Sequence, residues 1–330
     1  MSRLRSLWRV PRGFVFGLAL GLVVASAGVV AAGGLHPPKI ITPKTANQVT
    51  NLDILRSEIK NYYGTPGAAA GSGATAGWTL ALNTSSNYAK EAAKVAKSGR
   101  LWLDAKAELH KYPMKAIVLD VDDTTLTTWD YELYSNWDYL PSTNTAFVGG
   151  SGGTFTGNIF PATPGMVQMV QVAHALGYAV FFITGRPDSQ HQQTIANLVS
   201  DTAAGYPTDT MTVTYSGATV PEVDAGYPMP TAVDIGHGAS LNGGHTYADG
   251  LFTKPAVGDY PAYLNQAQFC ASYITAAQSC PTIQYKSGTR AYIESRGYTI
   301  VGNFGDQFSD LLGGFAVKNF KMPNPNYYLP

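Results

Sequence analysis

Charge is scarce in this sequence, and neither sign predominates. Only 13% of the 330 residues are charged, and 22 basic side chains balance 22 acidic ones. Proteins that bind nucleic acids usually carry basic clusters, so the zero net charge gives no support for a nucleic-acid partner. The 45% hydrophobic content and the chain length are sufficient for one large domain or two ordinary ones with an ample core.

Cysteine is also scarce, since the chain has only Cys270 and Cys280. Their spacing is not that of a zinc site, and no cluster of His or Cys accompanies them, which argues against metal binding by this pair. Two cysteines that close a short loop in an exported protein are typical of a disulfide. Two buried free thiols are the alternative.

The N-terminus predicts export from the cytoplasm. Four arginines precede an apolar segment over residues 14–32, which is the order found in a signal peptide. An uncleaved anchor is the alternative, because about 19 apolar residues approach the length that spans a bilayer. We favour a cleaved signal at residues 1–32, followed by a linker at 33–46. Either interpretation places the bulk of the chain in a secreted or cell-envelope location, with membrane contact only if the segment is uncleaved.

The most informative stretch is Lys115–Leu126, which has the sequence K-A-I-V-L-D-V-D-D-T-T-L. The apolar run Ala116–Leu119 predicts a strand that is buried on both faces, as in a parallel sheet. Asp120 and Asp122 follow this strand, although buried unpaired charges are strongly unfavourable. Ligands bind at the carboxyl ends of strands in open α/β sheets, so a cation or a phosphate chemistry there would explain the acids.

Two later segments repeat the pattern of an apolar strand followed by polar side chains. Tyr178–Thr184 ends in a hydroxyl, and Tyr298–Val301 leads to Asp306 and Asp310. A helix predicted over Met166–Leu176 connects the first two strands, as in the βαβ unit of a parallel sheet. We therefore expect the polar residues after all three strands to lie at one edge of the sheet.

Apolar residues at helical spacing predict two helices before the acidic strand. They cover Asn47–Tyr63 and, approximately, Asn87–His110, and we expect both to cover the sheet. Another helix is predicted over Asp188–Ser200. The segment Lys286–Arg290 leads into a short helix that ends near residue 297.

The segment Thr127–Phe160 is rich in glycine and aromatic residues. Its large aromatic residues are Trp129, Tyr131, Tyr134, Trp137, Tyr139 and Phe147. One interpretation is a cap over the end of the first strand, in which the rings exclude water and hold a substrate. The other is ordinary packing, because aromatic side chains bury large areas wherever they lie.

The segment from residue 202 to about 282 has little periodicity and is too long for a plain connection. We interpret it as an insertion that contains the two cysteines. Its scattered acids and imidazoles are more typical of surface residues than of a second metal site. They are His237, His245, Asp249 and Asp259.

The acids after the strands supply oxygen ligands without thiolates or imidazoles, which favours a hard cation such as Mg²⁺. These acids are Asp120, Asp122, Asp306 and Asp310. Thr184 and Lys286 add a hydroxyl and a positive charge that suit phosphate oxygens. A carboxylate can attack phosphorus to form an aspartyl-phosphate. Asp122 could protonate the leaving oxygen and then deprotonate the water that cleaves the intermediate, while Mg²⁺ and Lys286 neutralise the phosphoryl oxygens.

The motifs occur in an order that resembles the haloacid dehalogenase-like (HAD) superfamily. Within it, the chain is similar to the secreted or envelope acid phosphatases of subfamily IIIB, which include plant vegetative storage proteins. The similarity extends roughly over residues 47–200 and 283–330. The matching segments are Asp120-x-Asp122-x-Thr124, Thr184-Gly185-Arg186, Y-K-S-G-T-R at Tyr285–Arg290, I-V-G-N-F-G-D-Q-F-S-D-L-L-G at Ile300–Gly313, and the terminal K-M-P-N-P-N-Y-Y-L-P.

This resemblance implies a Rossmann-like parallel sheet flanked by helices. The domain would cover residues 47–330, with a small cap at about 127–160. The resemblance further implies Asp120 as the nucleophile and Asp122 as the general acid and base. Thr184, Gly185 and Lys286 would hold the phosphoryl group.

The resemblance also implies a set of metal ligands. Mg²⁺ would bind the carboxylates of Asp120 and Asp306 and the backbone carbonyl of Asp122. Asp310 would support these ligands or orient Lys286.

The leading hypothesis is an exported Mg²⁺-dependent acid phosphatase that acts on small phosphate monoesters, with nucleotides or aryl phosphates suggested by the aromatic segment. A phosphotransferase that passes the phosphoryl group to an alcohol is an alternative within enzymes. A non-catalytic storage or binding protein on the same fold is an alternative of another class. The presence of Asp120 with every partner residue argues against the latter, because some plant storage relatives have lost the nucleophile.

Overall fold

The computed structural model describes residues 36–68, 82–108, 111–148, 160–199, 212–215, 218–221, 225–233 and 249–329. The predicted signal peptide or anchor at residues 1–32 lies outside these ranges, as do His237 and His245. No helix within the described ranges combines the length and the apolar character needed to cross a membrane.

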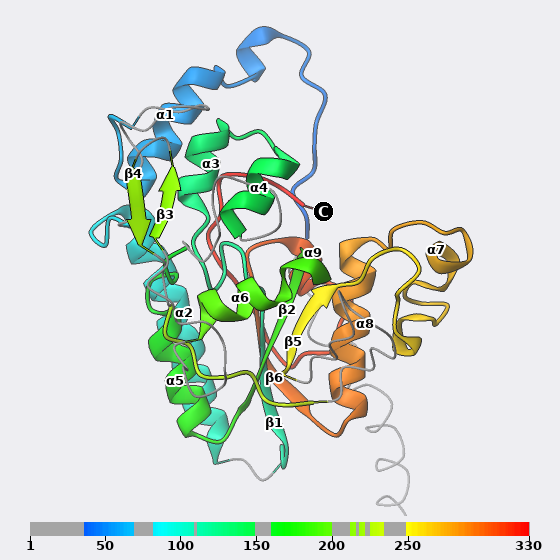
Figure 1. Cartoon of the computed structure of the whole chain (residues 1–330). Helices are drawn as coiled ribbons and strands as arrows, with labels where there is room; N and C mark the ends of the chain where they lie inside the picture. The colour runs from blue at the N-terminus through cyan, green and yellow to red at the C-terminus, as the bar shows by residue number, and fades with distance from the viewer. Residues whose placement is uncertain are drawn as a thin grey trace, which may run out of the picture.

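A parallel sheet of five strands forms the centre of the fold (Figure 1). Every pair of neighbouring strands in it is parallel. In spatial order the strands are β5 (Leu251–Lys254), β2 (Ala179–Pro187), β1 (Lys115–Leu119), β6 (Thr299–Gly305) and β7 (Asn319–Lys321). The predicted α/β class with a parallel sheet is confirmed.

Strand β1 is buried on both faces, as its continuous apolar sequence predicts. Alternate side chains of a strand point to opposite faces of the sheet. Ile117 and Leu119 accordingly pack in one core cluster, and Ala116 and Val118 pack in a second. The central strand therefore joins the two halves of the hydrophobic core.

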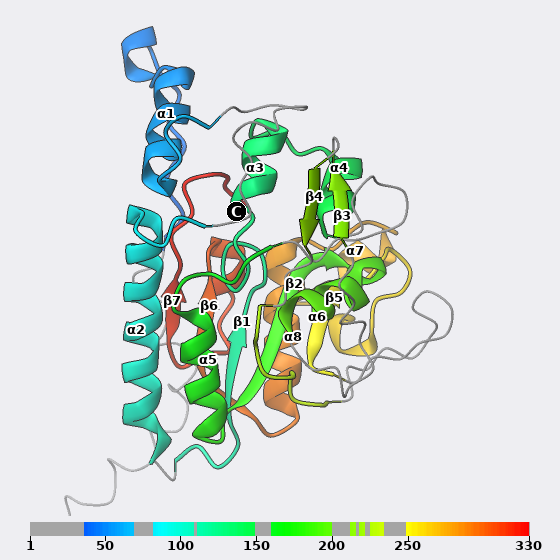
Figure 2. The ribbon, with the colours of Figure 1, turned by 60° about the vertical axis from the view of Figure 1, so that its left-hand side comes forward.

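Helices cover both faces of the sheet (Figure 2). α2 (Asn87–Ala107) and α5 (Met166–Ala175) pack against each other on one face, and α8 (Thr282–Ser295) covers the other. The other helical segments are η1 (Ala46–Gln48), α1 (Leu52–Tyr63), α3 (Trp129–Ser135), α4 (Pro141–Val148), η2 (Asp188–Gln190), α6 (His191–Leu198), η4 (Ala262–Leu264), α7 (Ala271–Thr275) and α9 (Phe308–Leu311). β3 (Thr212–Tyr215) and β4 (Ala218–Pro221) form a separate antiparallel pair.

Three predicted boundaries are wrong. The first helix begins at Leu52, because the side chain of Asn51 caps it by accepting the N–H groups of the next turn. The last predicted strand continues to Gly305, since its second half pairs with β1 and β7. Lys286 lies inside α8 and not ahead of a helix.

The segment interpreted as an insertion, at about residues 202–282, also contributes to the central sheet. This segment supplies β5, which pairs with β2 at the edge of the central sheet. Leu251 and Phe252 of β5 are fully buried. Asp249 is not a surface residue either, because its carboxylate lies 2.9 Å from Nε2 of the buried His191. A strand of four residues is too short to show a period in the sequence.

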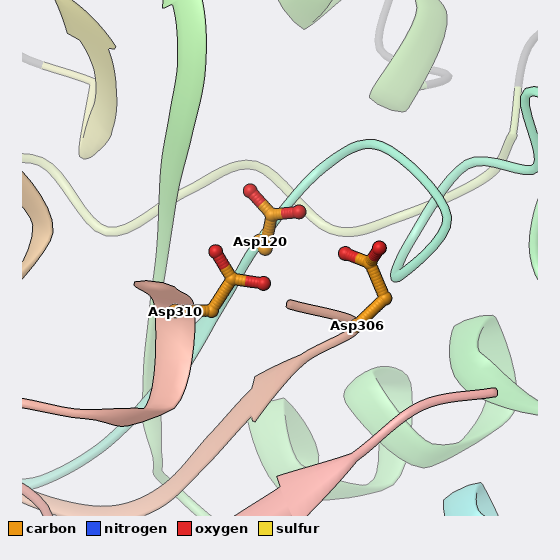
Figure 3. Close-up of side chains that lie close together, drawn as sticks. All are labelled: Asp120, Asp306 and Asp310. Atoms are coloured by element: carbon orange, nitrogen blue, oxygen red, sulfur yellow. The ribbon is translucent and has the colours of Figure 1, made fainter. Parts of the chain in front are cut away.

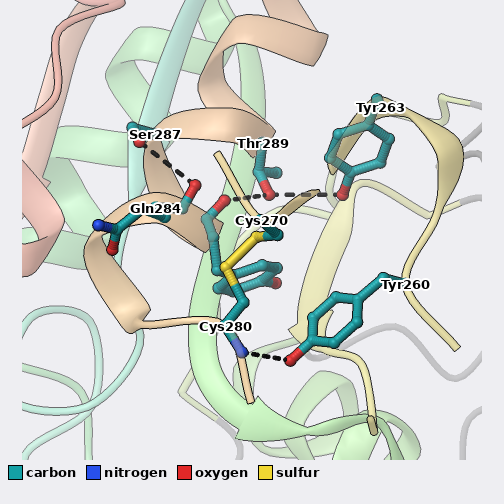
Figure 4. The surroundings of a disulfide bond; sticks show 8 residues. Tyr260, Tyr263, Cys270, Cys280, Gln284, Ser287 and Thr289 are labelled. Carbon is teal, nitrogen blue, oxygen red and sulfur yellow. Dashed lines mark hydrogen bonds between the residues drawn. A yellow bond between two sulfur atoms is a disulfide. The ribbon is translucent and has the colours of Figure 1, made fainter. Parts of the chain in front are cut away.

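The predicted disulfide between Cys270 and Cys280 is present (Figure 4). Both cysteines are fully buried in the core cluster that α8 covers. The backbone N–H of Cys280 donates to the hydroxyl of Tyr260 at 2.8 Å. Because only Pro281 separates Cys280 from α8, the disulfide fixes the start of the helix that contains Lys286.

Replacing both cysteines by alanine should lower the free energy of unfolding by about 2–4 kcal/mol, because the unfolded chain regains the freedom that the cross-link removes. Urea unfolding followed by tryptophan fluorescence measures this loss. The wild-type protein under a reducing agent is the matched control, since it keeps both sulfur atoms in the core. Equal stability of the oxidised and reduced wild-type proteins would contradict the expectation.

Candidate functional site

The register of the sheet brings the first two acids together. Leu119 of β1 pairs with Phe304 of β6, and Asp120 and Asp306 follow these two strands. The N–H of Asp120 donates to the carbonyl of Phe304 at 2.9 Å, which extends the pairing one residue beyond β1. The two carboxylates therefore lie side by side at the carboxyl edge of the sheet.

A third carboxylate joins them from the first turn of α9 (Figure 3). One oxygen from each of Asp120, Asp306 and Asp310 lies within 4.8 Å of the others, and all three residues are buried. This group could hold a metal ion, and carboxylate oxygens are the ligands that hard cations prefer. The fourth predicted acid, Asp122, lies close enough for its charge to act on Asp120.

Lys286 is the cation inside this group. Its Nζ donates to Oδ1 of Asp120 and to Oδ1 of Asp310 at 2.6 Å. Burial disfavours the charged ammonium, but the two carboxylates outweigh this effect and raise the pKa of Lys286. The second oxygen of Asp310 accepts the backbone N–H of Gln307 at 2.8 Å, which completes a capping box at the start of α9.

Among the described residues, Lys286 is the ammonium that forms ion pairs with this group, and the pKa values of Asp120 and Asp306 reflect the shortage of positive charge. Burial, followed by the charge of Asp310, raises the pKa of Asp120 well above its ordinary value. The same two causes raise the pKa of Asp306 to about 7. Loss of water and mutual repulsion thus both oppose full ionisation. A divalent cation would offset both effects, so the residues present fit the Mg²⁺ that the sequence predicts.

Asp122 points its carboxylate to a different partner, Arg186. The guanidinium donates through Nη2 to Oδ1 of Asp122 at 2.6 Å and through Nε to Oδ2 at 3.0 Å. A third bond from Nη1 to Thr194 at 3.0 Å fixes the guanidinium itself. The side chain of Arg186 is 3% exposed, whereas that of Asp122 is 30% exposed. Asp122 therefore combines a firm orientation with access to solvent.

Thr184 and Gly185 lie near the end of β2, beside these acids. Phe182 pairs with Leu119 of β1, so Thr184 lies beyond the end of β1. Thr184 is fully buried, and its hydroxyl accepts the backbone N–H of Arg186 at 3.1 Å. A Cβ placed on Gly185 would meet nothing within 4 Å, which leaves open space in front of its backbone.

The aromatic segment is mainly packed into the core. Trp129 stacks on Tyr63 of α1 with ring centroids 4.2 Å apart, and Tyr131 and Phe147 are buried. Tyr139 is the exception, because 73% of it is exposed. Of the two interpretations of these rings, packing holds for most of them, and a cap remains a proposal.

The same segment contains two buried acids that the sequence reasoning missed. Burial alone raises the pKa of Asp130 to about 8. Burial also raises the pKa of Glu132, with further contributions from Asp123, Asp122 and Asp306. Helix α3 therefore brings another carboxylate toward the edge of the sheet. The sequence interpretation of this segment considered only its aromatic residues.

Two further contacts were not predicted. Arg186 bonds to Asp122, 64 residues away, and Asn324 donates to Asp306, 18 residues away, at 2.7 Å. The sequence analysis noted both residues only within motifs, and the local pattern contains no direct signal for either contact. Their position within the motifs that resemble a known family is the one signal that could have identified them.

The family described as HAD superfamily, subfamily IIIB (Acid phosphatase) matches residues 73–215 and 270–330, more than half of the chain. The match includes the four acids, Thr184 and Lys286, but it begins after α1, which the predicted similarity had included.

Similarity to individual curated proteins is confined to a short stretch. The chain is 52% identical over 46 residues to Acid phosphatase 1 of Solanum lycopersicum, which is 14% of this chain and 18% of that protein. It is 48% identical over 48 residues to Vegetative storage protein 2 of Arabidopsis thaliana, again 14% of this chain and 18% of that protein. The chain thus matches less than a fifth of the length of these relatives.

Among solved structures, the chain is similar to the class C acid phosphatase from Bacillus anthracis. The two are 17% identical, with 74% of this chain and 81% of that chain covered and a TM-score of 0.41.

Replacing Lys286 by methionine should lower the free energy of unfolding of the metal-free protein by about 3–5 kcal/mol, because it leaves two buried carboxylates without their cation. Urea unfolding in the presence of a chelator measures this loss. Lys97→Met on the exposed face of α2 is the matched control and should have little effect. If Lys286→Met lowered the free energy of unfolding as little as the control does, the ammonium group would not be required for stability.

Replacing Asp130 by asparagine should make stability less dependent on pH. Because the pKa of Asp130 is raised to about 8 in the folded protein and is near 4 when unfolded, the folded state binds the extra proton. The wild type should lose stability relative to Asp130→Asn as the pH rises from about 4 to about 8, by at most roughly 1.4 kcal/mol per pH unit.

Thermal unfolding at a series of pH values measures this difference. The exposed Asp138 supplies the matched control, since Asp138→Asn should not reproduce the trend. A constant stability difference between Asp130→Asn and the wild type across this range would contradict the raised pKa.

Proposed function

Because the chain belongs to subfamily IIIB of the HAD superfamily, the acid phosphatase family, we propose that it is a Mg²⁺-dependent phosphatase that hydrolyses small phosphate monoesters through an aspartyl-phosphate. The observation that supports this most directly is the hydrogen bonding of the two carboxylate oxygens of Asp120. Its Oδ1 is held by Lys286, while no donor among the described residues bonds its Oδ2. One carboxylate oxygen is thus positioned and the other is available as a nucleophile.

In this proposal the Oδ2 atom of Asp120 attacks phosphorus, and the bond from phosphorus to the ester oxygen breaks. Lys286 and Thr184 bind the phosphoryl oxygens, with the open space at Gly185 leaving room for them. Mg²⁺, held by Asp120, Asp306 and the backbone carbonyl of Asp122, would supply positive charge against these oxygens. Preorganised charge of this kind usually accounts for the largest part of the rate gain.

Asp122 is the residue proposed to move the protons. In the first step it donates a proton to the departing ester oxygen and becomes a carboxylate. In the second step it accepts a proton from the water that attacks the aspartyl-phosphate, which regenerates Asp120 and releases phosphate. The bidentate contact with Arg186 holds Asp122 in one orientation for both steps, and its partial exposure lets it reach the leaving group.

Asp310 has a different proposed role, although it belongs to the same group of three carboxylates. Both of its oxygens are engaged, one by Lys286 and the other by the N–H of Gln307. We therefore assign it to the orientation of Lys286. The Cys270–Cys280 disulfide supports a location outside the cytoplasm, in agreement with the export segment predicted at residues 1–32.

The second candidate function is storage or binding without catalysis, which the similarity to Vegetative storage protein 2 favours. The presence of Asp120 together with Lys286 and Asp122 favours the enzyme instead. A phosphotransferase would use the same residues and differ only in the acceptor of the second step.

Hydrolysis of an aryl phosphate by the full-length protein tests the proposal. Activity should require Mg²⁺, disappear with a chelator and return when Mg²⁺ is added back. Asp120→Asn should lower kcat on the order of 10⁴-fold or more, since it removes the nucleophile. Asp104→Asn on the exposed side of α2 is the matched control and should retain wild-type activity.

Each alternative gives a distinct result in this assay. Substantial activity in Asp120→Asn would rule out the aspartyl-phosphate. A folded wild-type protein without activity toward any phosphate monoester would favour storage or binding. Adding an alcohol and comparing released phosphate with released aryl alcohol would reveal transfer, because transfer yields less phosphate than aryl alcohol.

A further inference from the structure

The last residues of the chain lie directly against the carboxylate group. We define the C-terminal tail as residues 322–329, which follow β7. Within it, Nδ2 of Asn324 donates to Oδ2 of Asp306 at 2.7 Å and approaches Oδ2 of Asp123 at 3.4 Å. Asn324 thus places one amide nitrogen between two buried acids that follow different strands.

The orientation of this amide is determined by its own partner. Oδ1 of Asn324 accepts the backbone N–H of Asn326 at 2.8 Å. An amide whose oxygen accepts from a backbone N–H must present its NH₂ group on the other side, where the carboxylates lie. The donor therefore faces Asp306 and Asp123 because of the local turn of the tail.

A second amide on Asp306 is held by the same tail. Nε2 of Gln307 donates to Oδ2 of Asp306 at 2.6 Å and to the carbonyl of Tyr327 at 3.3 Å. Oε1 of Gln307 accepts the backbone N–H of Leu329 at 2.8 Å. Both amide donors to this carboxylate oxygen thus depend on tail residues, and Thr124 donates to the other oxygen at 3.2 Å.

The tail is attached to the fold independently of these acids. Nδ2 of Asn326 donates to the hydroxyl of Tyr63 in α1 at 2.9 Å, and Trp137 Nε1 donates to Oδ1 of Asn326 at 3.3 Å. Asn326 therefore anchors the tail, and among the described residues its hydrogen bonds involve neither Asp306 nor Asp123. Replacement of Asn326 is therefore the control for replacement of Asn324.

We propose that Asn324 is a positioning residue that orients the Asp306 carboxylate for metal binding. This inference rests on the proposed function, because it assumes that Asp306 binds Mg²⁺. Partners that hydrogen-bond to metal ligands fix the orientation of those ligands, and their loss typically reduces metal affinity by roughly 10- to 100-fold.

A neighbouring cavity allows the effect of Asn324 on metal affinity to be distinguished from its effect on stability. Its volume is about 390 Å³, and Asp306, Asn324 and Lys321 are among the residues that line it. If the amide of Asn324 is removed, water from this cavity can hydrate the exposed carboxylate oxygen. Such water satisfies the hydrogen bond but does not hold the carboxylate in one orientation, so metal affinity should fall more than stability.

Calorimetric titration of Mg²⁺ into the full-length wild type, Asn324→Ala and Asn326→Ala tests the proposal. Asn324→Ala should raise the Kd for Mg²⁺ roughly 10- to 100-fold, while Asn326→Ala should leave it near the wild-type value. With aryl phosphate as substrate, kcat of Asn324→Ala should recover at saturating Mg²⁺, and the KM for substrate should stay unchanged. A purely structural role would lower thermal stability without this selective change in Mg²⁺ affinity.

The outcomes separate this inference from the proposed function. If the wild type binds no Mg²⁺, both the metal site and this inference are overturned. If the wild type binds Mg²⁺ and Asn324→Ala binds it equally well, only the inference fails, as it also does if Asn326→Ala loses as much affinity. Should Asn324→Ala not unfold cooperatively, Asn324→Leu, of similar shape, replaces it, and failure of both to fold would show that the residue serves the fold.

Discussion

A buried ammonium group holds the carboxyl edge of the sheet together. Lys286 extends from α8 to Asp120 after β1 and to Asp310 in α9, and each of these charges would be strongly unfavourable without the others. Arg290, one turn further along α8, donates to the backbone carbonyls of Asp310, Leu312 and Gly314. The position of α8 is thus determined by charge at one edge as well as by apolar packing on the sheet, and the disulfide fixes its start.

Among the described residues, the carboxyl edge of the sheet has more buried carboxylates than cations paired with them. Within that part of the chain, Lys286 forms ion pairs with Asp120 and Asp310, no ion pair is formed by Asp306, and Asp122 pairs with the guanidinium of Arg186. Folding alone gains nothing from an excess of buried carboxylates, since apolar residues of similar volume often stabilise more. The arrangement fits a site that could hold a divalent cation, as the proposed function requires.

Much of the fold and of the site was predictable because the signals are local. β1, α5 and β2 have continuous apolar runs or helical periodicity, and parallel strands bring the residues after them to one edge. β5 and β7 were not predictable, because strands of four and three residues have no measurable period and form by pairing with strands already in place. The contact between Arg186 and Asp122 joins residues 64 positions apart, and no pattern within either segment indicates it.

The sequence by itself determined the parallel α/β class, the acids at the strand ends and the pairing of the two cysteines, because apolar runs, residue type and spacing are properties of short segments. The tertiary structure alone decided which charges meet. It paired Asp122 with Arg186, placed Lys286 between Asp120 and Asp310, and brought Asn324 of the tail to Asp306. Those contacts depend on strand register and helix docking, which arise from the packing of the whole chain and not from any one segment.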